Sequence, residues 1–303
     1  MRSISLFIIY MLTSFLAYSQ EMYVGQVYAN IEKSVHTYAD TLRLDFYTAK
    51  ESRSTADRPL LVVVHGGGFA GGKRDNPEET KFAQKMATKG YAVASISYDL
   101  TRAGKRNGFG CDCPAALKIE TFKTNSKNIL DAVDYLKNGE DFNFDANKII
   151  LVGSSAGAEG VLNTVYMQAY PDYAELHLDR YKFAAVVSFA GAVLDARYIQ
   201  EENAVPAFLI HGKKDQLVPY SSAPHHFCKL GDFGFLPLDG SKIIADHLKE
   251  LNASHYLVTA PEGNHDWSGL GYGYVDAIAK FVNSVVNKGE NVQVDDAIAE
   301  EKN

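Results

Sequence analysis

The 303-residue sequence has little cysteine, a deficit of basic charge and few long apolar runs, and each shortage excludes a class of protein. Its three cysteines are Cys111, Cys113 and Cys228. An odd number leaves at least one thiol unpaired, and Cys111 and Cys113 lie too close in the chain for an easy mutual bridge. Two alternatives remain: a disulfide from one of them to Cys228, or three free thiols. No fourth ligand is evident beside the cysteines, so the sequence predicts no metal site.

Acidic residues outnumber basic residues by 37 to 30, which gives a formal net charge of −7. Nucleic acids and anionic membranes attract basic patches, so this balance argues against both as partners. The hydrophobic content of 46% is sufficient for one buried core, and no internal repeat or low-complexity tract divides the chain. We expect one domain over residues 20–287, followed by a polar, acidic tail over residues 288–303 that frays.

The N-terminal residues have the pattern of a secretory signal peptide. The positive charge of Arg2 precedes a mostly apolar segment over residues 4–17, and the small residues Ala17 and Ser19 then offer a cleavage site. The apolar segment is too short for a helix that spans a membrane. We predict that residues 1–19 direct the protein to the periplasm or the medium, with a retained membrane anchor as the alternative.

The spacing of apolar residues predicts alternating strands and helices. Leu42, Leu44 and Phe46 alternate with polar residues, which predicts an antiparallel strand with one solvated face. The continuous apolar run Leu60–Val64 predicts a parallel strand buried on both faces. Further strands are predicted over 91–97, 148–152, 184–189, 207–210 and 255–259, and helices over 78–88, 119–136, 156–169, 240–251 and 274–286. This order predicts an α/β fold, with a mostly parallel central sheet and helices on both faces.

Two segments are longer than ordinary connections, namely Leu100–Pro114 and an insertion over about residues 221–239. Both follow predicted strands, and ligands of parallel sheets bind beyond the carboxyl ends of the strands. We predict that Phe233 and Phe235 of the insertion, together with Phe69, form an apolar wall of a substrate pocket. Packing of the insertion onto the body of the protein is the alternative.

The sequence Gly153-Ser154-Ser155-Ala156-Gly157 matches the pattern G-x-S-x-G between a predicted strand and a predicted helix. The turn between the two elements is sharp, so glycine is required at the two outer positions. Such a turn exposes the central serine at the start of a helix, whose N–H groups attract an anion. The pattern therefore predicts Ser155 as a nucleophile.

Three consecutive glycines follow His65 at the end of a predicted buried strand. Acyl transfer passes through a tetrahedral oxyanion, which needs N–H donors at a place that side chains would crowd. We predict that Gly67, Gly68 and Ala156 donate these hydrogen bonds, while His65 positions the loop. The sequence lacks G-K-[ST] and a helix-opening G-x-G-x-x-G, which excludes the common phosphate cradles, and no cofactor is predicted.

A serine hydroxyl is a weak nucleophile, so it needs a histidine base and a carboxylate that orients the base. Where the serine lies on such a turn, the expected order along the chain is serine, acid, histidine. Asp215 follows the penultimate predicted strand of the parallel sheet, and His265 follows the last. We therefore predict that both lie at the same sheet edge as Ser155. Asp195 is the alternative acid.

Together the segments HGGGF, GSSAG, HGKKDQLVP and GNHDW resemble the α/β-hydrolase superfamily. More narrowly, they are similar to the HGGG-bearing esterases of the hormone-sensitive-lipase-like and carboxylesterase types. The resemblance implies a serine esterase that works through an acyl-enzyme, with Ser155 as nucleophile, Asp215 as acid and His265 as base. The implied substrate is a small-molecule or polysaccharide-linked ester, such as an acetyl or feruloyl ester. A non-catalytic ligand-binding homologue, a lipase and a peptidase of the same fold are alternatives.

Overall fold

The computed structural model describes residues 21–50 and 57–299, and the predicted signal peptide lies outside these residues. Within them, nine strands form one sheet in the order β1-β2-β4-β3-β5-β6-β8-β11-β12. The strands are β1 (Ile31–Ala39), β2 (Leu42–Ala49), β3 (Leu60–Val64), β4 (Ala92–Ile96), β5 (Ile149–Ser154), β6 (Ala185–Phe189), β8 (Ala207–Gly212), β11 (His255–Ala260) and β12 (Gln293–Ala297). β2 pairs antiparallel with both β1 and β4, and every pairing from β4 to β12 is parallel.

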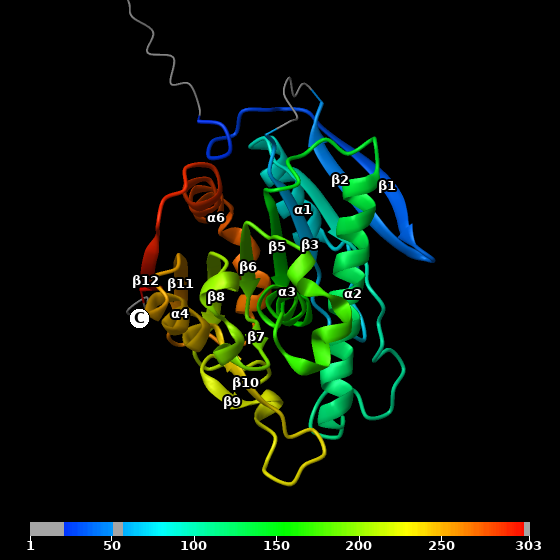
Figure 1. Ribbon diagram of the computed structural model, residues 1–303, viewed down its shortest axis with the longest axis vertical. Helices are drawn as coiled ribbons and strands as arrows, with labels where there is room; N and C mark the ends of the chain where they lie inside the picture. The colour runs from blue at the N-terminus through cyan, green and yellow to red at the C-terminus, as the bar shows by residue number, and fades with distance from the viewer. Residues whose placement is uncertain (1–20, 51–56, 300–303) are drawn as a thin grey trace, which may run out of the picture.

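Helices cover both faces of this sheet (Figure 1). They are α1 (Pro77–Thr88), α2 (Ala115–Asn138), α3 (Ala156–Tyr166), α4 (Ser241–Glu250), α5 (Trp267–Leu270) and α6 (Val275–Val282), which a π-helical turn extends over Asn283–Asn287. Along β3, Leu60, Val62 and Val64 pack in a core with α2, α3 and α4. Leu61 and Val63 pack in a second core with α1 and α6.

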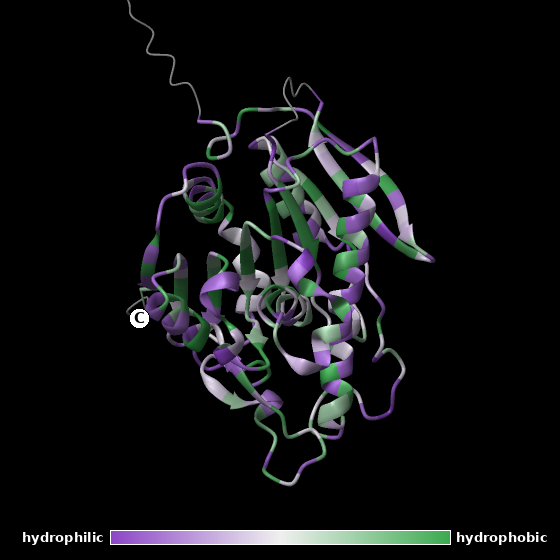
Figure 2. Ribbon diagram, viewed as in Figure 1, coloured by the Kyte–Doolittle hydropathy of each residue, from purple (hydrophilic) through white to green (hydrophobic). Residues whose placement is uncertain are grey.

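Side chains alternate between the faces of a strand, so a strand that is apolar at every position needs a helix layer on each side. Figure 2 shows this pattern in the hydrophobic central strands β3, β5 and β6. The predicted α/β architecture, mostly parallel and covered on both faces, is confirmed. No helix in the described part of the chain has the length and apolar character needed to cross a membrane.

The fraying predicted for residues 288–303 is wrong for Gln293–Ala297, which forms β12. This strand pairs in parallel with β11, from Gln293 opposite His255 to Ala297 opposite Thr259. Four of its five side chains are exposed. Backbone hydrogen bonds rather than apolar side chains hold β12 in place, so hydrophobic periodicity does not reveal it.

The insertion, predicted as a loop over 221–239, begins and ends in short strands. β9 (Ser222–Pro224) and β10 (Pro237–Gly240) pair antiparallel, and β10 also pairs with β7 (Ala192–Val193) in a second, small sheet. Between β9 and β10 the chain projects at the lower end of the view in Figure 1. A disulfide between Cys111 and Cys228 fastens it to the long loop after β4, and Cys113 is free and buried.

Candidate active site

Ser155 occupies the turn between β5 and α3 with a strained backbone, at φ 51° and ψ −120°. Its N–H donates to the carbonyl of Phe189 at 2.9 Å, which ties the turn to β6. A Cβ atom at Gly153 would lie 2.3 Å from the carbonyl oxygen of Gly157, and one at Gly157 would lie 2.2 Å from that of Val64. Glycine is therefore required at both outer positions. The tight turn exposes the Ser155 hydroxyl at the start of α3.

A chain of hydrogen bonds joins Ser155, His265 and Asp215. The Ser155 Oγ lies 2.8 Å from the His265 Nε2, and the His265 Nδ1 lies 2.6 Å from the Asp215 Oδ2. His265 follows β11 and Asp215 follows β8, so the three side chains meet at one sheet edge from different strands. Because a carboxylate only accepts, Nδ1 carries the proton and Nε2 is free to accept the proton of the serine.

Asp215 is 1% exposed and has several partners. Its Oδ1 accepts the N–H groups of Leu217 at 2.8 Å and Val218 at 3.0 Å, and the His211 Nε2 lies 3.3 Å from its Oδ2. Burial alone would raise the pKa of this carboxyl, but hydrogen bonds from His211 and His265 outweigh it and hold the pKa of Asp215 below its usual range. The carboxylate is therefore charged at neutral pH and stabilises a positive charge on His265.

The alternative acid, Asp195, is engaged elsewhere. Its carboxylate accepts the N–H of Arg197 at the start of the 3-10 turn Ala196–Tyr198 and pairs with the Arg197 guanidinium at 2.6 Å. Of the two candidate acids, Asp215 is the one that contacts His265.

The glycine loop after β3 lies against Ser155. Gly67 and Gly68 have φ values of 123° and 60°, which favour glycine. Both residues and Ala156 line a cavity with Ser155. Within the described chain, none of these three N–H groups donates a hydrogen bond to the protein. Three donors beside the nucleophile are thus free to hold an oxyanion.

His65 holds this loop in position. Its Nδ1 donates to the carbonyl of Gly66 at 2.7 Å, and its ring stacks on Tyr98 with 4.3 Å between the centroids. The Tyr98 hydroxyl donates to the His65 carbonyl at 2.9 Å. Burial lowers the pKa of His65 to about 4, so the ring is neutral at pH 7. A neutral, stacked ring fixes the start of the glycine loop without adding charge.

A cavity of about 340 Å³ surrounds Ser155 and His265. Both long loops contribute to its walls, together with the segment after β8, through Phe109, Leu217, Val218, His225 and His226. Glu159 also lines the cavity, and motif reasoning missed it. A single acidic residue in the otherwise apolar stretch of α3, one turn after the serine, is the signal that would have found it.

The predicted wall of Phe69, Phe233 and Phe235 needs correction, because none of the three lines this cavity in the described chain. Phe69 is 1% exposed and packs edge-on against Phe109, with centroids 4.8 Å apart, so it supports the wall from behind. Phe233 is 81% exposed. Its carbonyl accepts the N–H of Ala115 at 2.8 Å, which fastens the backbone to the start of α2 and leaves the ring in solvent.

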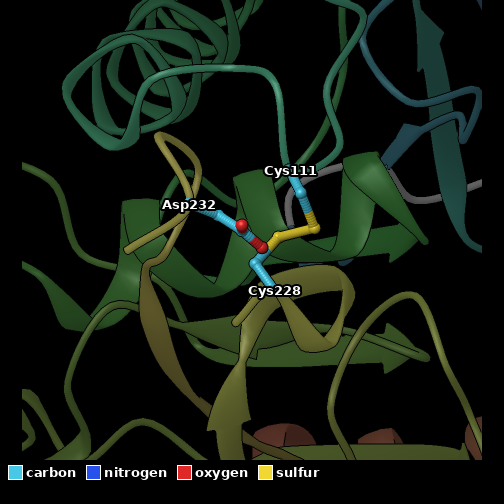
Figure 3. Close-up of side chains that lie close together, drawn as sticks. All are labelled: Cys111, Cys228 and Asp232. Atoms are coloured by element: carbon cyan, nitrogen blue, oxygen red, sulfur yellow. A yellow bond between two sulfur atoms is a disulfide. The ribbon is translucent and has the colours of Figure 1, made fainter. Parts of the chain in front are cut away.

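Cys111, Cys228 and Asp232 place their sulfur and carboxylate atoms within 4.8 Å of one another, a grouping that resembles a metal site (Figure 3). The two sulfurs are bonded to each other, so neither is a thiolate ligand. A single carboxylate remains, and we assign no metal to this group. The disulfide joins the two loops that carry Phe109 and His225.

The BD-FAE family model matches residues 44–196, half of the chain. The chain belongs to the BD-FAE family. This is an esterase family of the α/β-hydrolase type. The matched residues contain the glycine loop and Ser155, whereas Asp215 and His265 lie beyond them. Among curated proteins, none matches the sequence of this BD-FAE member.

Solved structures share the fold of this BD-FAE member. Esterase Est2 from Thermogutta terrifontis, with butyrate bound, is 16% identical, with a TM-score of 0.56 over 85% of this chain and 94% of that chain. MGS-M1, an α/β-hydrolase enzyme from a Medee basin deep-sea metagenome library, is 18% identical, with a TM-score of 0.56 over 85% and 98%. The fold is therefore that of the α/β-hydrolases, as predicted.

Proposed function

We propose that this BD-FAE member is a serine esterase that cleaves carboxylic esters through an acyl-enzyme on Ser155. The hydrogen-bond chain from Ser155 through His265 to Asp215, at 2.8 and 2.6 Å, carries the proposal. Three N–H donors line the cavity beside the same serine. A non-catalytic binding protein has no need of a complete set of nucleophile, base, acid and oxyanion donors.

The proposed reaction has two halves. In the first, the His265 Nε2 accepts the proton of Ser155 as Oγ attacks the ester carbonyl carbon, and the free N–H groups hold the oxyanion. As the intermediate collapses, His265 donates that proton to the leaving alcohol. In the second, water loses a proton to His265 and attacks the acyl carbon, which frees the carboxylic acid and restores Ser155. Asp215 stays ionised and stabilises the imidazolium.

We propose that the substrates are esters of small acyl groups, either as free small molecules or linked to polysaccharides as acetyl or feruloyl esters. A cavity of about 340 Å³ supports an acyl group of this size. Est2 of Thermogutta terrifontis is described with butyrate bound and, in a second structure that is 17% identical with a TM-score of 0.56, as phosphorylated by paraoxon. Rates of hydrolysis measured on a panel of acetyl, feruloyl and longer-chain esters, together with acetylated xylan, rank these substrates.

We also propose that the protein works outside the cytoplasm, in the periplasm or the medium. The signal-peptide pattern of residues 1–19 supports this location. The disulfide between Cys111 and Cys228 supports it independently, because disulfides persist in oxidising compartments.

Replacement of Ser155 by alanine tests the esterase proposal. We expect Ser155→Ala to fold and to lose about 10³-fold or more in kcat/KM on p-nitrophenyl acetate, because the nucleophile is gone. A fluorophosphonate probe should label the wild-type protein and not this variant. Ser154→Ala is the matched control, because the Ser154 hydroxyl donates to the Ser268 carbonyl at 2.9 Å and not to His265. Full activity or labelling of Ser155→Ala would refute the proposal.

A further inference from the structure

Glu159 and His225 are among the polar side chains that line the cavity beside Ser155 without a part in the proposed ester hydrolysis. Glu159 is 2% exposed and His225 is 1% exposed. Glu159 lies one turn after Ser155 on α3, where its N–H donates to the Ser155 carbonyl at 2.9 Å. His225 comes from the insertion, where its N–H donates to the Leu236 carbonyl at 2.8 Å. Glu159 thus comes from the body of the protein and His225 from the insertion, and both line the same cavity.

The protein leaves both side chains with unused hydrogen-bonding capacity. Within the described residues, the Glu159 Oε1 and the His225 Nδ1 have no hydrogen-bond partner. The Glu159 Oε1 lies 3.3 Å from the His225 Nε2, near enough for contact but without the geometry of a hydrogen bond. Unpartnered buried polar groups are rare and costly. Two of them on the wall of one cavity indicate a ligand that supplies their partners.

Burial sets the charge of both groups. It raises the pKa of Glu159 to about 8, against the opposing effect of nearby histidines and Lys118. It lowers the pKa of His225 well below the usual value. At pH 7 the cavity therefore presents a protonated carboxyl and a neutral imidazole, each with a donor and an acceptor. A hydroxyl group, which both donates and accepts, matches this pair, whereas two neutral groups offer an ion no charge of opposite sign.

We propose that Glu159 and His225 form a hydrogen-bonding subsite that selects esters with a hydroxyl group a few bonds from the scissile carbonyl. The inference rests on the proposed function and defines the substrates of the same site. Four residues at a rise of 1.5 Å separate the Cα atoms of Ser155 and Glu159 by about 6 Å along the helix. This separation sets the distance between the scissile carbonyl and the substrate hydroxyl that the subsite binds. The hydroxyl belongs to either the acyl or the alcohol part of the ester.

Two matched pairs of esters distinguish these two sources. On the acyl side, p-nitrophenyl 3-hydroxybutyrate is compared with p-nitrophenyl butyrate. On the alcohol side, 2,3-dihydroxypropyl acetate is compared with propyl acetate. We expect the wild-type protein to prefer the hydroxylated member of one pair by about tenfold in kcat/KM, the effect of one well-formed hydrogen bond. The pair that shows the preference identifies the part of the ester that reaches Glu159.

Substitutions then assign the preference to the two residues. Glu159→Leu and His225→Phe remove the donors and acceptors, so the ratio of the two kcat/KM values should fall close to one. Glu159→Gln keeps a donor and an acceptor and should retain most of the preference. A merely structural role would lower both kcat/KM values together and leave their ratio unchanged. Glu79→Gln is the matched control, because Glu79 is also buried with a raised pKa but contacts Tyr272 rather than the cavity.

The outcomes separate this inference from the proposed function. If the wild-type protein turns over the esters without a preference in either pair, or if Glu159→Leu keeps the preference, the subsite is overturned and the esterase stands. If none of the four esters is turned over and a fluorophosphonate does not label Ser155, the proposed function itself is overturned.

Discussion

Glu159 couples the stability of the protein to pH. Burial raises its pKa from the ordinary value of 4.5 to about 8. Between these two values the folded protein keeps a proton on Glu159 that the unfolded chain has released. Raising the pH through this window therefore favours the unfolded chain. The titratable and charged groups that interact with Glu159 are Tyr98, Lys118, Asp215, His225, His226 and His265.

We predict that Glu159→Gln flattens the fall in stability across this window, because glutamine does not titrate. Between about pH 5 and about pH 8.5, the melting temperature of the wild-type protein should fall by several degrees more than that of the variant. Scanning fluorimetry at a series of pH values measures both. Glu175→Gln serves as the exposed control and should follow the wild-type curve. Parallel curves for wild type and Glu159→Gln would contradict the burial account.

The sequence predicts the positions of Ser155, Asp215 and His265 because each residue follows a strand. The carboxyl ends of parallel strands lie at one edge of the sheet. The direction of a side chain within a loop is harder to predict. The sequence predicts Phe233 in the cavity wall, whereas its side chain lies in solvent, because its direction depends on which backbone groups fasten the loop. Glu159 belongs to no motif, and its role depends on a neighbour, His225, that is distant in sequence.

The loop after β4 and the insertion form one wall of the cavity, because covalent and polar contacts join these two elements. The Cys111–Cys228 bond closes a separation of 117 residues. The buried Lys118 of α2 donates to the carbonyl of Gly234 at 2.8 Å, which is a further point of attachment for the insertion. The sequence predicts both loops from their length but leaves the cysteine pairing open, because pairing depends on which loops the fold brings together.

We predict that breaking this disulfide loosens the wall and impairs substrate binding. The double variant Cys111→Ser/Cys228→Ser should lose about 2–4 kcal/mol of stability, which lowers the melting temperature by about 5–10 °C. KM should rise more than kcat falls, because Phe109 and His225 lie on the joined loops while Ser155 does not. Thermal melts and steady-state kinetics on p-nitrophenyl acetate measure these effects.

Reduction gives an independent check with Cys113→Ala as the control, since this thiol is unpaired. Dithiothreitol should lower the melting temperature of the wild-type protein and of Cys113→Ala, but not that of the double variant. An unchanged melting temperature after reduction, with the released thiols titrated, would show that the bond does not stabilise the wall.

Across the whole molecule, the centre of the sheet is better predicted than its edges. The central strands are apolar on both faces, so composition alone marks them, and their ends position the proposed catalytic residues. The edge strands β1 and β12 have mostly exposed side chains and depend on backbone pairing with a neighbour. Hydrophobic periodicity gives no signal for such strands, which is why the sequence predicts neither β1 nor β12.

The edge strand β12 should stabilise the fold without taking part in the reaction. We predict that truncation after Lys288 removes about 1–3 kcal/mol of stability and exposes the edge of β11 to other chains, so that light scattering on heating increases. kcat/KM should stay within about threefold of the wild-type value, because His265 remains bonded to Ser155 and Asp215. Truncation after Ala299 is the control, since it retains β12 and the bond from the Ile298 N–H to the Thr259 carbonyl. If activity falls further than the loss of folded protein accounts for, β12 instead positions the loop of His265.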